Sequence, residues 1–287
     1  MDLWNTSTEI QFFNDALNTF ASPEQLFYRL GSDYYAYFPK GFNAKGATLQ
    51  SRNSLIGRFT ENWSKRIFDG IAQSMGLYAV DGVICEEIGL TNKSSADLAF
   101  CTTDEIRQKP ENIKLVFEIK MSIVSNYKFV KPDQIEWIGD YKSHKGNPSL
   151  LRSDSMLKAI GKSVNIRIAS LNSASIPVVV LGNSPITQHY EHKVDFLRSS
   201  GMIQGFWSLN PSPTGTTYII ESEKSGFITF TNYDEIASKC SELISSDNNF
   251  FSAMIPKSQL GQFIRISAEE VTDLAKGEKF LELLKLI

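Results

Sequence analysis

The sequence is poor in the residues that build disulfide frameworks and transition-metal sites. Its 287 residues include only three cysteines and three histidines, which are Cys85, Cys101 and Cys240, and His144, His189 and His192. The cysteines are widely spaced with no CxxC pair, and the histidines form no HExxH pattern, which argues against zinc chemistry. A hard cation held by oxygen ligands remains open. The isolated cysteines suit a reducing compartment, so we expect a cytoplasmic protein.

Long apolar runs are also missing. No stretch of about 18 apolar residues occurs, which predicts no membrane span. The first residues, MDLWNTSTEIQFFND, lack a basic segment followed by an apolar core, so we expect no secretory signal. An apolar content of 42% in 287 residues is typical of a globular protein with one large domain or two modest ones.

The net charge of −3 is small, but the charges are unevenly distributed. Residues 29–66 hold seven Lys or Arg against two acids, and residues 142–167 hold six against one. Residues 81–105 invert this, with six acids and one Lys. Two basic stretches flanking an acidic centre suit phosphate contacts around a cation site, although solvated faces scattered over the surface would give the same pattern.

Residues 94–122 contain the most informative pattern, because two strands are predicted there. Residues 114–122 alternate, with Leu115, Phe117, Ile119 and Met121 on one face and Val116, Glu118, Lys120 and Ser122 on the other. Residues 95–102 form the predicted partner strand, with Asp97 on its polar face. Pairing the two strands would bring Asp97 beside Glu118 and Lys120, a combination that suits a divalent-metal site with a general acid or base. An exposed ion pair on an edge strand is the alternative, worth only about 0–1 kcal/mol.

At these residues the sequence resembles the PD-(D/E)XK nuclease superfamily, whose members include type II restriction endonucleases. Asp97 would be the acidic residue of the first part of the pattern, with Ala96 where proline is commoner, and Glu118-Ile119-Lys120 would be the second part. The resemblance covers residues 55–181. It implies that Asp97, Glu118 and the backbone carbonyl of Ile119 hold Mg²⁺, while Lys120 orients or deprotonates the attacking water.

The predicted order of elements agrees with this resemblance. A long helix from residue 53 or 54 to 75, strands at 77–88, 95–102 and 114–122, a helix at 154–171 and a strand at 176–181 give αβββαβ. We therefore expect an α/β fold with a restriction-endonuclease-like αβββαβ core, a central mixed β-sheet flanked by helices, and N- and C-terminal additions. Residues 132–147 are expected to be irregular. The helix at 154–171 is expected to bury the apolar side made of Leu157, Ile160, Val164, Ile168 and Leu171.

Outside this core the predictions are coarser. Residues 1–53 should form a helical extension, residues 54–185 the catalytic core, and residues 186–287 an α/β region packed on it. Helices are expected at 8–20 (capped by Thr6 or Ser7), after Ser22-Pro23, and at 192–203, 233–245 and 268–287. Short strands are expected at 205–209 and 226–230.

Further site residues follow from position. Glu61, in the first half of the long helix, matches a place where the family often supplies another carboxylate, and Glu86 and Glu87 compete with it for that role. The basic residues Arg52, Arg58, Lys158 and Lys162 are candidates for DNA contacts. Glu191-His192-Lys193 and Asp140-Tyr141-Lys142 also have the carboxylate-x-Lys form but lack an alternating strand, so we interpret them as surface charges. Gly161-Lys162-Ser163 resembles the end of a P-loop, but Met156 stands where its first glycine must be, so no nucleotide cofactor is expected.

Together the resemblance and the residues predict a Mg²⁺-dependent endonuclease of double-stranded DNA, in particular a type II restriction enzyme acting as a homodimer. Two alternatives remain. One is a repair, recombination or transposition nuclease of the same fold. The other is a catalytically idle DNA-binding protein on that scaffold, which would bind DNA without cutting it.

Overall fold

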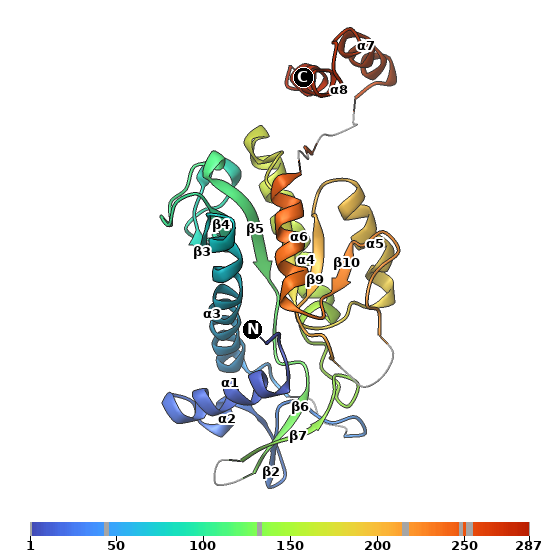
Figure 1. Cartoon of the computed structure of the whole chain (residues 1–287). Coiled ribbons are helices and arrows are strands. Elements are labelled where there is room, and N and C mark those ends of the chain that lie inside the picture. The colour runs from blue at the N-terminus through green and yellow to red at the C-terminus, as the bar shows by residue number, and fades with distance from the viewer. Residues whose placement is uncertain are drawn as a thin grey trace.

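A mixed β-sheet of six strands forms the centre of the computed structural model (Figure 1), which describes residues 2–42, 46–130, 134–213, 218–246, 249–250 and 255–286. Its strands are β3 (Tyr78–Val83), β4 (Ala96–Cys101), β5 (Ile113–Ile119), β8 (Val178–Gly182), β9 (Gly205–Ser208) and β10 (Phe227–Thr229). They lie in the order β10-β9-β8-β5-β4-β3. The pairs β3–β4 and β4–β5 are antiparallel, whereas β5–β8, β8–β9 and β9–β10 are parallel. The protein is therefore an α/β protein, as the sequence predicts.

Helices cover both faces of this sheet. The 25-residue helix α3 (Gln50–Ser74) and α6 (Tyr233–Ser245) pack on one face, where Phe68, Phe100, Phe117 and Trp207 are fully or almost fully buried. Helices α4 (Ser153–Ala169) and α5 (Gln188–Ser199) pack on the other face. The central strands are buried on both sides, which explains the continuous apolar run of β8.

A second, antiparallel sheet lies beyond one end of the first (Figure 1). Its strands are β1 (Tyr28–Leu30), β2 (Asp33–Tyr35), β6 (Asn126–Val130) and β7 (Gln134–Gly139), in the order β1-β2-β6-β7. This sheet corrects two predictions, because the N-terminal segment is not purely helical and residues 134–139 form a strand. It also connects to the first sheet directly, since residues 120–125 lead from the end of β5 into β6.

The N-terminal helices agree with the predictions in extent, although one cap differs. Helix α1 (Thr6–Thr19) begins at the N-cap Asn5, whose side chain accepts from the Thr8 amide, rather than at Thr6 or Ser7. Helix α2 (Pro23–Leu26) has the predicted Ser22 N-cap, with a capping box completed by Gln25. Phe12 and Phe13 of α1 are buried in the main core, where Phe12 lies against Phe59 of α3 and Phe13 against Tyr127 of β6, so α1 packs on the long helix and on the small sheet.

The C-terminal residues form two helices where one was predicted. Helices α7 (Lys257–Ser267) and α8 (Asp273–Leu284) make a hairpin that projects from the rest of the chain in Figure 1. Of the described side chains in these two helices, only Ser267 is buried. None of the helices in the described part of the chain is both long enough and apolar enough to cross a membrane.

The apolar side predicted for α4 is wrong. Met156, Ala159, Ser163 and Ile166 face the sheet, whereas Leu157, Ile168 and Leu171 are all more than 60% exposed. The buried side includes Ala and Ser because small side chains let the helix approach the sheet closely. This rotation of α4 brings Lys162 toward the sheet instead of toward the solvent.

Candidate functional site

Asp97 and Glu118 lie on adjacent antiparallel strands, as the sequence predicts. Leu98 of β4 is opposite Phe117 of β5, so the residues next to them, Asp97 and Glu118, are neighbours on the face covered by α4. The backbone N–H of Ile119 donates a 2.7 Å hydrogen bond to Oδ2 of Asp97. This bond crosses between the two strands and fixes the orientation of the Asp97 carboxylate.

Glu118 and Lys120 form a close ion pair in the middle of the sheet. Lys120 Nζ contacts Oε1 of Glu118 and lies 3.2 Å from the carbonyl oxygen of Ile119 and 3.9 Å from Oδ2 of Asp97. The Glu118 side chain is 7% exposed. Strand β5 is central, with β4 on one side and β8 on the other, so the alternative of an exposed ion pair on an edge strand does not apply.

A second lysine completes the cluster from the helix above the sheet. Lys162 Nζ of α4 lies 2.5 Å from Oε2 of Glu118 and 3.2 Å from Oδ1 of Asp97. One ammonium thus bridges the two carboxylates, each through the oxygen that faces α4. The sequence placed Lys162 only on a polar helix face as a candidate DNA contact, and its position between Asp97 and Glu118 was not predicted.

Burial and neighbouring charges both act on the pKa values of Glu118 and Lys162. Burial raises the pKa of Glu118, and the charge of Asp97 raises it further, while Lys120 and Lys162 lower it. Burial disfavours the charged form of Lys162, but the carboxylates of Glu118 and Asp97 outweigh that effect and raise the pKa of Lys162. With both carboxylates ionised and both lysines charged, the four groups are electrically neutral.

The donor set fits a hard divalent cation. Two carboxylates present one oxygen each toward a single positively charged group, and carboxylate oxygens are the preferred ligands of Mg²⁺. In this structure the shared group is the Lys162 ammonium, which is itself a cation. Among the described residues no three His, Cys, Asp or Glu side chains assemble into a group that could hold a metal. Asp97 and Glu118 would therefore supply the side-chain ligands as a pair.

Glu61 lies close to this pair without joining it. It is an exposed residue of α3, and partial burial of its carboxyl followed by the charge of Asp97 raises its pKa. Glu86 and Glu87 are exposed at the 3₁₀-helix Glu86–Ile88, where Glu86 pairs with Arg107 and Glu87 accepts from Asn172. Of the three extra carboxylates considered from the sequence, Glu61 is the one that the cluster influences.

The four candidate DNA-binding residues separate into different environments. Arg52 is 5% exposed, and its guanidinium donates to the backbone carbonyls of Leu26 and Ala36 and packs over the rings of Tyr28 and Tyr37. Its expected role in DNA contact is therefore corrected to a structural one. Arg58 and Lys158 are exposed on α3 and α4, with Lys158 3.1 Å from Asp154.

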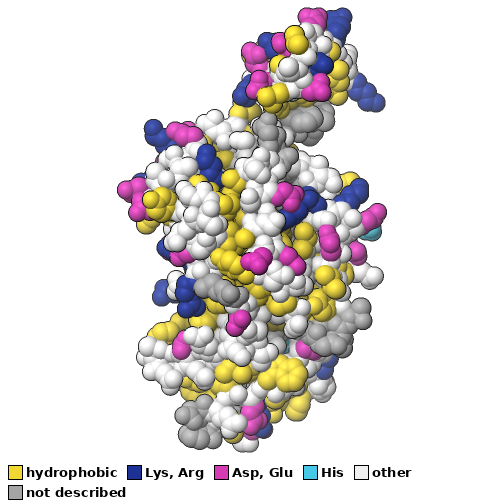
Figure 2. Space-filling model, viewed as in Figure 1, with side chains coloured by type: hydrophobic (Ala, Val, Ile, Leu, Met, Phe, Trp, Pro, Cys, Tyr) yellow, Lys and Arg dark blue, Asp and Glu magenta, His cyan; other side chains and the backbone are white. Residues whose placement is uncertain are grey.

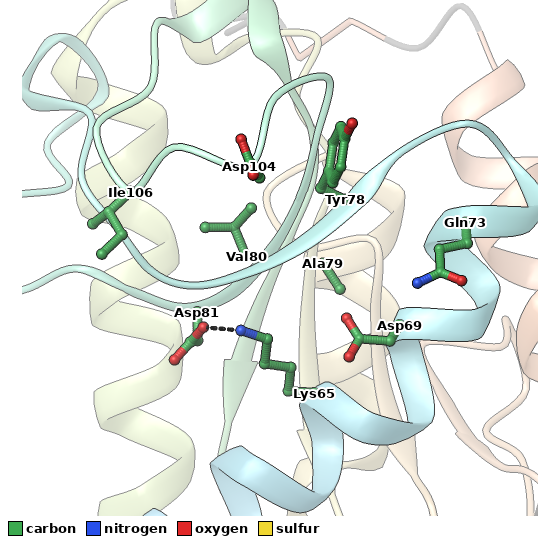
Figure 3. A pocket seen from close by; sticks show the side chains of 9 residues that line it. All are labelled: Lys65, Asp69, Gln73, Tyr78, Ala79, Val80, Asp81, Asp104 and Ile106. Atoms are coloured by element: carbon green, nitrogen blue, oxygen red, sulfur yellow. Dashed lines mark hydrogen bonds and ion pairs between the residues drawn. The ribbon is translucent and has the colours of Figure 1, made fainter.

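A second group of charges lies in a hollow lined by residues of α3 and β3 (Figure 3). Lys65 of the N-terminal basic stretch is 2.5 Å from Asp81 there, with Asp69, Tyr78 and Asp104 around them. On the face seen in Figure 2, basic and acidic side chains are interspersed. Lys65 is thus neutralised by Asp81, so the sequence count of basic residues overstates the charge available to phosphate.

Sequence reasoning missed Glu9, whose hydrogen bonds hold the segment that follows Lys120. This buried residue of α1 accepts hydrogen bonds from Trp4 Nε1 (3.0 Å), the amides of Val124 (2.6 Å) and Ser125 (3.1 Å), and the hydroxyl of Tyr127 (2.7 Å). Its partners are more than 110 residues away for three of the four bonds. The only local signal was a glutamate within an aromatic helix face.

A second polar network holds the same segment. The amide of Ser122 donates to Asn183 Oδ1 (3.1 Å), and Asn183 Nδ2 donates to the carbonyl of Ser122 (2.7 Å). Ser122 Oγ accepts from the amide of Ser149, which has a left-handed backbone conformation with φ of 51°. Ser122, which the sequence placed on the polar face of a strand at 114–122, lies three residues after the end of β5 and connects this segment to the end of β8 and to the turn before α4.

Comparison with protein-family models, curated proteins and solved structures finds no match for this chain. The resemblance described above therefore rests on three residues of this chain, Asp97, Glu118 and Lys120, and on the order of the elements around them. That order is α3, β3, β4, β5, α4, β8, with the strands β6 and β7 inserted before α4.

Proposed function

We propose that this protein is a divalent-metal-dependent nuclease that hydrolyses phosphodiester bonds of double-stranded DNA. The observation that supports it most is the pair of carboxylates, Asp97 Oδ1 and Glu118 Oε2, converging on one cationic group at 3.2 Å and 2.5 Å. A lysine, Lys120, lies beside the same pair. Two carboxylates with an adjoining ammonium suit attack of water on an anionic ester.

Asp97 and Glu118 would hold Mg²⁺ between them, with the carbonyl of Ile119 as a further oxygen donor. The bound ion would lower the pKa of a water molecule and polarise the phosphate. The protein contributes by fixing both carboxylates before substrate arrives. The Ile119 amide orients Asp97, and burial in the central sheet limits the conformations of Glu118. Such prior orientation avoids reorganisation during the reaction.

Lys120 acts on the nucleophile and on developing charge. Its amide donates to the carbonyl of Leu181 at 2.7 Å, so the residue is held where β5 ends and its side chain is held by Glu118. An ammonium there would orient the attacking water and oppose the negative charge that grows on the phosphate oxygens. Only about a fifth of the side chain is exposed, which keeps solvent from screening that charge.

The finer assignment is a sequence-specific type II restriction endonuclease. It is favoured by the family resemblance and by a chain with additional elements around the core but no nucleotide-binding motif. A symmetric recognition site would require two copies of the chain, each supplying one Asp97–Glu118 pair. Strand β6 of the second sheet begins six residues after Lys120, so this sheet is continuous in the chain with the site and is assigned the recognition contacts in this proposal.

One observation favours a second function, that of a DNA-binding protein without catalysis. The four charges of Asp97, Glu118, Lys120 and Lys162 already neutralise one another, so the site is stable without a metal ion. Such a protein would bind DNA equally well with and without Mg²⁺ and would never cut it.

Cleavage of supercoiled plasmid by the purified protein separates the two functions. A nuclease should nick or linearise mixed-sequence plasmid with Mg²⁺ and not with EDTA, and Glu118→Gln and Lys120→Met should each abolish most of that activity. Lys193→Ala is the matched control, because Lys193 belongs to the similar tripeptide Glu191-His192-Lys193 on exposed α5, where it contacts His189. Metal-independent binding with no cleavage under any condition would reject the nuclease proposal.

A further inference from the structure

Lys162 occupies the position that a shared metal ion would need. Its ammonium contacts Oδ1 of Asp97 and Oε2 of Glu118, while the other two oxygens have other partners. Oδ2 of Asp97 accepts from the Ile119 amide, and Oε1 of Glu118 contacts Lys120. The two oxygens most available to a metal are therefore the two that Lys162 holds.

Charge makes simultaneous occupation unfavourable. With two carboxylates and two ammonium groups the cluster is neutral, and adding a divalent cation would give it a net charge of about +2 in a largely buried site. The Lys162 side chain is 16% exposed, so solvent screens this repulsion weakly. Removing the Lys162 ammonium from between the carboxylates relieves both the repulsion and the overlap in space.

Lys162 has a direction in which to move. It is one helical turn after Lys158, whose side chain is 70% exposed and lies at the protein surface. A lysine is a flexible chain with a compact charge, so its ammonium can swing outward without any change in the helix. A DNA phosphate brought to the metal would give the released ammonium a new anionic partner in place of the two carboxylates that it left.

We propose that Lys162 is an exchangeable internal counter-ion of this site, which competes with the divalent metal in the free protein and transfers to a phosphate of the substrate when metal and DNA bind together. The proposal rests on the proposed nuclease function, since it assumes that Asp97 and Glu118 hold a metal. Its consequence is that DNA and metal each strengthen the binding of the other. The metal replaces Lys162 between Asp97 and Glu118, and the DNA phosphate binds the Lys162 ammonium that the metal releases.

The first test is titration of the full chain with Mn²⁺ alone, followed by electron paramagnetic resonance of free Mn²⁺. Lys162→Met keeps the length of the side chain and removes its charge, so the variant should bind Mn²⁺ roughly tenfold more tightly than the wild type. Lys158→Met is the matched control on the same helix, and its affinity for Mn²⁺ should stay close to that of the wild type. Equal or weaker Mn²⁺ binding by Lys162→Met would overturn the proposal.

A second test uses the wild type, so it holds even if the variant folds poorly. Acylation of lysines by a succinimidyl ester, read by mass spectrometry, should be slow at Lys162 in the free protein. Labelling of Lys162 should accelerate several-fold with saturating Ca²⁺ and become slow again with Ca²⁺ and duplex DNA, while Lys193 labels equally in all three states. If Ca²⁺ binds and the acylation rate at Lys162 does not change, the exchange of Lys162 is rejected and the nuclease function is not. Absence of any metal binding, in the wild type and in Lys162→Met, would reject the nuclease function and the exchange together.

Discussion

The backbone amide of Ile119 and the carboxylate of Asp97 form a 2.7 Å hydrogen bond that joins strand β5 to the acidic side chain of β4. The bond engages Oδ2 and leaves Oδ1 directed at Lys162. Strand pairing therefore determines which oxygen of Asp97 is available to a cation. Asp97 therefore has two properties that matter, its charge and its capacity to accept this hydrogen bond. Substitution by Asn removes the charge alone, whereas substitution by Ala removes both.

We predict that Asp97→Asn and Asp97→Ala both abolish Mg²⁺-dependent cleavage but differ in stability. The Asn side chain can still accept from the Ile119 amide, whereas Ala leaves that amide without its acceptor, which costs about 1–3 kcal/mol. Urea unfolding should show Asp97→Ala as the less stable variant, and plasmid cleavage should show both as inactive. An Asp97→Asn variant that cleaves like the wild type would contradict the role of Asp97 as a metal ligand.

Glu9 should be intolerant of even its closest substitute. All four of its hydrogen-bonding partners are donors, and burial raises the pKa of Tyr127, so that hydroxyl keeps its proton and remains a donor. Glu9→Gln would point an amide NH₂ at one or more of these donors and leave buried groups unpaired. We expect a loss of about 2–4 kcal/mol in the free energy of unfolding.

Urea denaturation measures the effect of Glu9→Gln, and Glu24→Gln in the short helix α2 gives a comparison of the same chemical change at a less buried residue. Because the segment Val124–Tyr127 follows Lys120, cleavage by Glu9→Gln should fall as well. A Glu9→Gln variant as stable as the wild type would show that the buried donors find other acceptors.

The sequence predicted the central strand pair because its pattern is local. Alternation in residues 114–122 assigns Glu118 and Lys120 to one face, and any antiparallel partner with Asp97 at the right register brings the charges together. The second sheet carries no comparable pattern. Its strands β1 and β2 have three residues each, and β7 has largely exposed side chains, so hydrophobic periodicity gives no signal there.

Two errors have a common physical origin. Arg52 was expected at the surface, but its partners are the backbone carbonyls of Leu26 and Ala36. Every residue has a backbone carbonyl, so such partners leave no pattern in the sequence. Helix α4 was assigned the wrong apolar side because the exposed residues Leu157, Ile168 and Leu171 are as hydrophobic as buried ones. In both cases tertiary packing determines whether the side chain is buried, and the type of residue does not. The position of Lys162 between two carboxylates depended on that packing.

Acid should loosen the junction between the two sheets through His144. Its Nε2 is 2.9 Å from the carbonyl of Val124 and its Nδ1 accepts from the Gly146 amide at 3.0 Å, which is the pattern of a neutral imidazole. Burial lowers the pKa of His144. Since the unfolded chain then binds the proton more readily, the stability that His144 contributes is present above the unfolded pKa of about 6.5 and is lost as the pH falls.

His144→Phe tests this dependence, since the Phe ring can still stack on Tyr37. In the wild type the ring centroids of Tyr37 and His144 lie 4.1 Å apart. At pH near 8 the variant should be less stable than the wild type by about 1–2 kcal/mol, because two hydrogen bonds are lost. Between pH near 7 and pH near 5 the variant should lose less stability than the wild type. Parallel pH profiles of the two proteins in urea denaturation would mean that His144 does not titrate in this range.

Two exposed basic residues flank the site and should contact phosphate. Arg58 lies three residues before Glu61 on α3, and Lys158 lies four residues before Lys162 on α4, so each is one helical turn from a residue at or near the cluster. The two helices cover opposite faces of the sheet. We expect a DNA backbone bound at Asp97 and Glu118 to contact both residues.

Binding of duplex DNA, measured by fluorescence anisotropy in Ca²⁺ over a range of salt concentrations, separates phosphate contacts from structural effects. Wild-type affinity should fall steeply with salt, and Arg58→Ala and Lys158→Ala should each reduce the slope of log K against log salt by about 1. Arg52→Met is the contrasting variant. Its guanidinium is already bound to two carbonyls, so it should lose stability in urea while the folded fraction keeps the wild-type slope. If Arg52→Met reduced the slope and neither exposed residue did, the phosphate contacts assigned to Arg58 and Lys158 would be wrong.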